Sequence, residues 1–167
     1  MKKTLEALNR LKEKAIIKEY AIGGGVATIF YTEPVFTYDL DVFIMIKTDP
    51  EEKIISLSPI YESLVGRGSF WKGEHIVVEG FPVQFIPASS GLEKEAILNA
   101  KEVTYSNVKT RVLSAEYLIA IALKVGRRKD LEKVSRLLEQ SRINKKSLGK
   151  ILKAHGLTDR FKKWQEK

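Results

Sequence analysis

The pattern of hydrophobic and polar positions predicts short strands and helices in the first two thirds of the chain. Leu5, Leu8 and Leu11 recur at helical spacing, which predicts an amphipathic helix over residues 4–18. Val42 to Ile46 is a continuous apolar run, typical of a strand buried on both faces, here over 40–47. Further strands are predicted at 20–23, 74–79, 81–86, 102–105 and 109–113, and helices at 26–32, from Asp49, at 58–65 and at 90–100.

From Ser114 onward the pattern is helical only. Helices are predicted at 115–125, 127–140 and 145–155, with a short last helix after Thr158. Strands followed by a run of helices indicate an α+β fold, in which helices flank a mixed sheet. We expect one domain, with an α/β core over 1–113 and a helical segment over 114–167 packed on it.

Two carboxylates lie at the start of the buried strand. Asp39 and Asp41 are two positions apart, so they project from the same face of the strand. Like charges this close repel unless a cation lies between them. Oxygen ligands in this arrangement suit Mg²⁺, with Mn²⁺ as the alternative ion, and substrate phosphates complete the coordination. The simpler interpretation is a solvated strand end.

Gly24 and Gly25 precede this pair by about fourteen positions, between a predicted strand and a predicted helix. A glycine-rich turn of this kind lets the backbone approach a ligand closely and can direct amides at phosphate, although most such turns are only turns. We expect the strands at 20–24, 40–47 and 75–86 to be neighbours. The glycines and the two aspartates would then lie at one edge and form one site.

These residues also carry a resemblance. Ile22-Gly-Gly-Gly-Val-Ala27 followed by Thr37-Tyr-Asp-Leu-Asp-Val42 resembles the motifs of the nucleotidyltransferase superfamily with the polymerase-beta-like fold. The later segments Phe81 to Pro87, Glu116 to Lys124 and Gly126 to Asp130 extend it to the small AbiEii/AbiGii-toxin-like group, over roughly residues 5–157. The resemblance implies transfer of a nucleoside monophosphate from an NTP to an unknown hydroxyl, on protein or RNA. It also implies a toxin-like role with an antitoxin partner.

The resemblance further implies roles for individual residues. Asp39 and Asp41 would be catalytic metal ligands, and Thr37 would lie near the metal. Lys124 and Arg127 would bind the nucleotide, and Asp130 would act as a base or orient the acceptor. Two structural alternatives stay open: Lys124 near a helix C-terminus and Asp130 at a helix start are both common placements.

Two positions depart from the family pattern. Gln84 stands where a third carboxylate is often found, and its amide can ligate a metal but cannot act as a base. Val35 stands where related sequences often carry Arg. Both departures favour a second interpretation, a nucleotide- or RNA-binding module that keeps the fold without turnover.

Composition narrows the classes of protein. The chain has no Cys, which excludes disulfides and thiolate chemistry, and only two His. Residues 1–100 contain 11 Lys/Arg and 14 Asp/Glu, whereas residues 101–167 contain 18 and 7, so the helical part is strongly basic and suits an anionic ligand. We find no apolar stretch long enough to span a bilayer and no signal-peptide core, so we expect a cytoplasmic protein without membrane contact.

Overall fold

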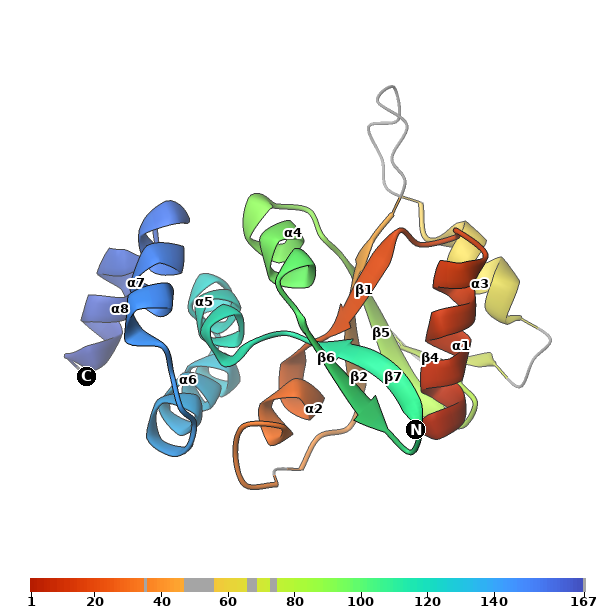
Figure 1. Cartoon of the computed structure of the whole chain (residues 1–167), viewed down its shortest axis with the longest axis horizontal. Helices are drawn as coiled ribbons and strands as arrows, with labels where there is room; N and C mark the ends of the chain where they lie inside the picture. Colours follow the sequence, from red (N-terminus) through yellow and green to blue (C-terminus); the bar gives the residue numbers. More distant parts are fainter. Residues whose placement is uncertain (35, 47–55, 66–68, 73–74, 167) are drawn as a thin grey trace.

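The protein has the expected α+β architecture. A computed structural model describes residues 1–34, 36–46, 56–65, 69–72 and 75–166, without the side chains of residues 71 and 72. Within these ranges seven strands form one mixed sheet in the order β3-β4-β5-β2-β1-β7-β6 (Figure 1). The helix expected from Asp49 and the departure at Val35 lie outside the described residues.

The buried strand predicted over 40–47 is central to the sheet as β2. It pairs antiparallel with β1 and parallel with β5, and β5 pairs antiparallel with β4, so the predicted neighbours are confirmed. The strands are β1 (Glu19–Ile22), β2 (Leu40–Met45), β3 (Phe70–Lys72), β4 (His75–Val78), β5 (Phe81–Pro87), β6 (Lys101–Tyr105) and β7 (Val108–Val112).

Helices cover both faces of this sheet. α1 (Lys2–Glu13) and α3 (Ser58–Leu64) lie on one side, as Figure 1 shows, and α4 (Gly91–Leu98) and α5 (Ala115–Val125) lie on the other. α2 (Gly24–Ile29) contacts both β2 and α5. The remaining helices, α6 (Arg128–Gln140), α7 (Lys145–Ala154) and α8 (Thr158–Gln165), extend the layer that α5 begins. No helix in the described part of the chain has the length and apolarity needed to cross a membrane.

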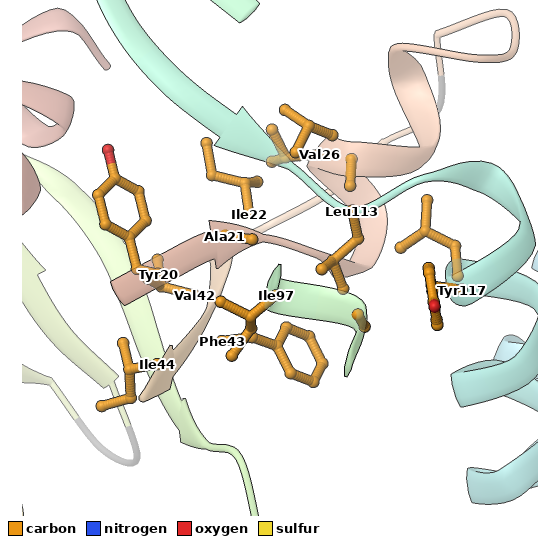
Figure 2. Close-up of a cluster of buried hydrophobic side chains, with 14 of the residues drawn as sticks. Tyr20, Ala21, Ile22, Val26, Val42, Phe43, Ile44, Ile97, Leu113 and Tyr117 are labelled. Carbon is orange, nitrogen blue, oxygen red and sulfur yellow. The ribbon is translucent and has the colours of Figure 1, made fainter. Parts of the chain in front are cut away.

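The core on the α4 side of the sheet positions the ends of β1 and β2. Figure 2 shows Phe43 of β2 and Ile97 of α4 together beside Ala21 of β1. Ala21 and Ile97 are fully buried, and Phe43 is nearly so. Removal of this apolar area from water stabilises the sheet at the point where the two candidate motifs meet.

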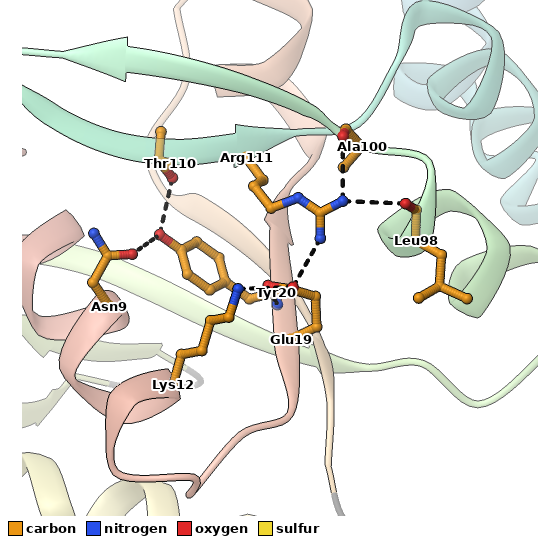
Figure 3. Close-up of polar contacts among 8 residues, drawn as sticks. All are labelled: Asn9, Lys12, Glu19, Tyr20, Leu98, Ala100, Thr110 and Arg111. Atoms are coloured by element: carbon orange, nitrogen blue, oxygen red, sulfur yellow. Dashed lines mark hydrogen bonds and ion pairs between the residues drawn. The ribbon is translucent and has the colours of Figure 1, made fainter.

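A polar cluster fixes the opposite side of β1 (Figure 3). The Tyr20 hydroxyl lies 2.7 Å from Asn9 Oδ1 on α1 and 3.0 Å from Thr110 Oγ1 on β7. Beside it, Arg111 contacts Glu19 at 3.1 Å and donates to the carbonyls of Leu98 and Ala100. These contacts join α1, β1, β7 and the end of α4, so the glycine turn after β1 starts from a rigid base.

Two helices, α1 and α2, end at least three residues earlier than the sequence predicts. α1 ends at Glu13 instead of residue 18, because Ala15 takes a left-handed conformation (φ 55°) that an α-helix cannot continue through. α2 spans Gly24–Ile29 instead of 26–32. There Thr28 and Thr32 donate their hydroxyls to carbonyls four residues earlier, a competition that weakens helices.

Candidate functional site

The glycine turn packs directly against Asp41. The Gly23 amide donates to the Asp41 carbonyl at 2.9 Å, which joins the turn to the start of β2. Gly24 has φ +56°, and a Cβ at this position would lie 1.6 Å from Asp41 Oδ2. Only glycine leaves room here for the aspartate side chain and adopts this backbone without strain. The glycine turn and the two aspartates therefore lie together, where β1 ends and β2 begins, as the sequence predicted.

Gly25 makes the second contact between the motifs. A Cβ at Gly25 would lie 2.5 Å from Thr37 Oγ1. The Thr37 hydroxyl in turn donates to the Asp39 carbonyl at 3.3 Å. Thr37 thus shapes the chain that leads into the two aspartates, which places it at the site without testing its predicted contact with a nucleotide.

Asp41 is a destabilised carboxylate. Burial, followed by the negative charges of Asp39 and Asp130, raises the pKa of Asp41 to about 6, although the positive charges of Lys133 and Arg127 act in the opposite direction. The carboxylate of Asp41 accepts no hydrogen bond from the described residues. This half-buried carboxylate therefore lacks a compensating positive charge in direct contact.

The neighbours of the pair come from β4 and β5. His75 Nε2 lies 2.9 Å from Asp39 Oδ2. Gln84 is paired in register with Asp41 across β2 and β5, so the position expected for a third carboxylate is beside Asp41 and is occupied by an amide. Gln84 can add an oxygen ligand there but no negative charge.

A cavity of about 280 Å³ lies between the start of β2 and the helices α5 and α6. The sheet contributes Asp41, Phe43 and Gln84, the start of α2 contributes Gly24, and α5 contributes apolar side chains such as Leu118. Arg127, Asp130 and Lys133, in α6 and just before it, form the opposite wall. The cavity therefore has a carboxylate wall, an apolar side and a wall that carries cations.

On the α6 side of the cavity, Asp130 is ion-paired with both Arg127 and Lys133, and we call these three residues the triad. Asp130 is only 5% exposed and lies in the first turn of α6. Its Oδ2 contacts Arg127 Nε at 2.8 Å, and its Oδ1 contacts Lys133 Nζ at 3.3 Å. Asp130 and Arg127 thus reach the predicted site, whereas the role of Asp130 as a base stays a prediction.

Lys124 is engaged elsewhere. Its ammonium donates to Glu93 Oε1 at 2.7 Å and to Ser90 Oγ at 2.8 Å, at the capping box that begins α4. Glu93 is the member of this pair that lines the cavity. A contact between Lys124 and a nucleotide stays a prediction, and it would require this ion pair to open.

The donors fit a magnesium ion that shares its ligands with a substrate. Among the described residues, no group of three or more His, Cys, Asp or Glu is arranged to hold a metal ion. Asp39 and Asp41 are hard oxygen donors, and a cation between them would relieve the repulsion that raises the pKa of Asp41. Mg²⁺ is commonly bound by one or two carboxylates together with phosphate oxygens, which matches this pair.

Three residues at the site were missed in the sequence. Lys133 lies three positions after Asp130, so helical spacing could have placed it on the same face. Glu93 was recognised only as a helix cap, because its cavity contact depends on how α4 lies against β2. His75 meets Asp39 only through the order β4-β5-β2, which periodicity does not encode.

Comparison with known proteins gives a fold relationship. No family model matches the chain, and no curated protein matches it. The chain is similar to a solved antigenic nucleotidyltransferase-like protein from Paracoccidioides brasiliensis, with TM-score 0.55, 17% identity, and coverage of 95% of this chain and 90% of that one. It is also similar to ANT(2")-Ia, solved in complex with adenylyl-2"-tobramycin, with TM-score 0.52, 14% identity, and coverage of 93% and 94%.

These similarities show a nucleotidyltransferase-like fold over nearly the whole chain. They agree with the superfamily that the glycine and aspartate motifs resemble. At identities of 17% and 14% they establish the fold and not the chemistry.

Proposed function

We propose that the protein is a metal-dependent nucleotidyltransferase that moves a nucleoside monophosphate from an NTP to a hydroxyl acceptor. The observation that carries the proposal is Asp41, a half-buried carboxylate beside Asp39 with no cation in direct contact among the described residues, in a cavity that Arg127 and Lys133 also line. A metal–triphosphate complex offers positive charge to the carboxylates and negative charge to the two cations. The nucleotidyltransferase-like fold supports the same chemistry.

In the proposed reaction an acceptor oxygen attacks the α-phosphorus of the NTP. A new P–O bond forms, the bond between the α-phosphorus and the bridging oxygen breaks, and pyrophosphate leaves with that electron pair. The acceptor hydroxyl gives up its proton to solvent water. Asp39 and Asp41 would hold Mg²⁺ or Mn²⁺, which when bound neutralises phosphate charge and orients the reacting groups. Gly24 leaves the space in which Asp41 lies beside the ligand.

The acceptor and the biological setting are proposed from the order of the motifs along the chain. The AbiEii-like order of motifs suggests a toxin paired with an antitoxin, acting on protein or RNA. The structural neighbour ANT(2")-Ia was solved with an adenylylated product, which illustrates a fold of this kind in complex with a modified small molecule.

A second candidate is a binding module that holds metal and NTP without turnover. Gln84 favours it, because this amide lies in register beside Asp41 where it cannot accept the acceptor proton. In that case the same cavity would bind Mg-NTP, and no nucleotidyl group would reach any acceptor.

Labelled substrate separates the two candidates. The protein is incubated with each NTP labelled at the α-phosphate, with Mg²⁺ or Mn²⁺ and a total cell extract, and label is followed on protein, RNA and small molecules. The transferase predicts labelling that Asp41→Asn abolishes and Asp159→Asn, at the exposed start of α8, leaves unchanged. Metal-dependent NTP binding with no labelled acceptor would favour the module instead.

A further inference from the structure

We infer that Arg127 and Lys133 are the residues that bind the triphosphate, and that Asp130 is a positioning residue that holds them and not the base. This inference rests on the proposed function, since it assigns roles within the same cavity. It transfers the phosphate contact predicted for Lys124 to Lys133, which the sequence analysis did not consider.

The geometry of the triad carries the first step. Asp130 is almost completely buried, and each of its two oxygens contacts a different cation. Charge-assisted contacts of this kind fix long side chains that would otherwise be mobile. The guanidinium of Arg127 and the ammonium of Lys133 therefore reach the cavity already oriented, with 77% and 33% of their side chains exposed.

Charge balance carries the second step. The triad holds two positive charges and one negative charge, so the α6 wall has an excess of one positive charge. The other side of the cavity carries Asp41, whose carboxylate feels the charge of Asp39, two residues earlier in the chain. A polyphosphate between these walls meets cations directly on one side, and on the other side it shares a metal ion with the carboxylates.

Lys124 is the weaker candidate for the same contact. Its ammonium already contacts Glu93 and Ser90, so binding phosphate would leave Glu93, only 8% exposed, without its cation. Lys133 needs no such exchange, because its only hydrogen bond among the described residues is with Asp130 Oδ1, and an ammonium has further donors for phosphate while that contact is kept.

The same contacts argue against Asp130 as the base. A general base needs an oxygen that can reach the proton of the acceptor hydroxyl. Both oxygens of Asp130 are engaged by cations, and a proton placed there would break the contacts that order the cavity wall.

Binding of inorganic tripolyphosphate in EDTA tests this assignment without metal or turnover. We expect Lys133→Gln and Arg127→Gln each to weaken tripolyphosphate binding by about tenfold or more. Lys133→Arg should retain most of the wild-type affinity. Arg128→Gln is the matched control, because Arg128 neighbours Arg127 but pairs with exposed Glu132. Wild-type binding in both Gln variants, or an equal loss in Arg128→Gln, would overturn the proposal.

The positioning role of Asp130 has its own readout. Asp130→Asn should weaken tripolyphosphate binding in the wild-type background and have no effect once Arg127 and Lys133 are both replaced by Gln, since it acts through them. An undiminished effect in the double variant would contradict the role. If Asp130→Asn does not fold, the Lys133 and Arg127 variants still decide the phosphate assignment.

Turnover, where it occurs, separates the positioning role from the base. Positioning predicts that Asp130→Asn raises KM for the NTP more than it lowers kcat, whereas a base predicts a fall in kcat with KM unchanged. Absence of turnover in the wild type would count against the proposed transferase and leave the tripolyphosphate result intact.

Discussion

At the scale of single residues, the site is built around Asp41, a carboxylate whose charged form the fold disfavours. Asp41 is half-buried beside Asp39 with no direct positive partner among the described residues, and Gly24 leaves the space that its Oδ2 occupies. Such an arrangement lowers the stability of the empty protein and raises its affinity for a cation. Stability given up at a buried charge is common at functional sites.

Asp41→Asn should therefore stabilise the metal-free protein at neutral pH. Because the folded-state pKa of Asp41 is raised from 3.8 to about 6, its ionisation removes stability as the pH rises between these values. The expected gain at pH 8 is up to about 3 kcal/mol, and it should vanish near pH 4. Urea unfolding at both pH values measures it. Equal stability of the two proteins at pH 8 would show that the burial does not strain Asp41.

Gly24→Ala should lower stability by more than the strain of a left-handed backbone alone would cause. Gly24 and Gly156 both have positive φ, but a Cβ meets Asp41 only at Gly24 and meets nothing within 4 Å at Gly156. We expect a loss of about 1–2 kcal/mol for Gly156→Ala from backbone strain. Gly24→Ala should lose more and should also lose Mg-NTP binding. Thermal unfolding and calorimetry measure both, and equal losses without a binding defect would remove the special role of Gly24.

At the scale of elements, the site depends on how firmly β1 and β2 are held at their ends. Tyr20 links β1 to α1 and β7 through one buried hydroxyl. On the other side of the sheet, the apolar core that contains Phe43 and Ile97 supports β1 and β2. The glycine turn leaves β1 only two residues after Tyr20. Its position therefore follows from this packing.

Tyr20→Phe should lower stability by about 1–3 kcal/mol. The change leaves Asn9 Oδ1 and buried Thr110 without a partner and removes no apolar area. Tyr38→Phe is the control, because Tyr38 is 73% exposed and should change stability by less than about 0.5 kcal/mol. Chemical denaturation compares the two, and similar small effects would mean that the hydroxyl of Tyr20 does not secure β1.

Local signals in the sequence predicted these elements well. The apolar run after Asp41 identified the central strand, and Ser90 with Glu93 identified the start of α4, because both signals act within a few residues. The early end of α1 at Glu13 was missed, since nothing in Lys14-Ala15 announces a left-handed residue. Contacts such as His75 with Asp39 depend on strand order, which only tertiary packing decides.

At the scale of the whole molecule, charge and topology agree. The acidic pair lies at the start of the central strand β2, and the basic sequence after residue 100 supplies Arg127 and Lys133 at α6, where they line the same cavity as Asp41. The charge distribution in the sequence suited an anionic ligand. It could not choose Lys133 over Lys124, because that choice depends on the ion pair between Lys124 and Glu93.

Metal-dependent nucleotide binding tests the central claim most directly. Isothermal calorimetry with each NTP, with Mg²⁺ and with EDTA, is compared between the wild type and Asp41→Asn. We predict that Mg²⁺ tightens NTP binding to the wild type at least tenfold, because Asp39 and Asp41 share the ion with the phosphates. In folded Asp41→Asn this Mg²⁺ enhancement should disappear. An enhancement of the same size in the variant, or none in the wild type, would contradict the assignment of the paired aspartates as a metal–nucleotide site.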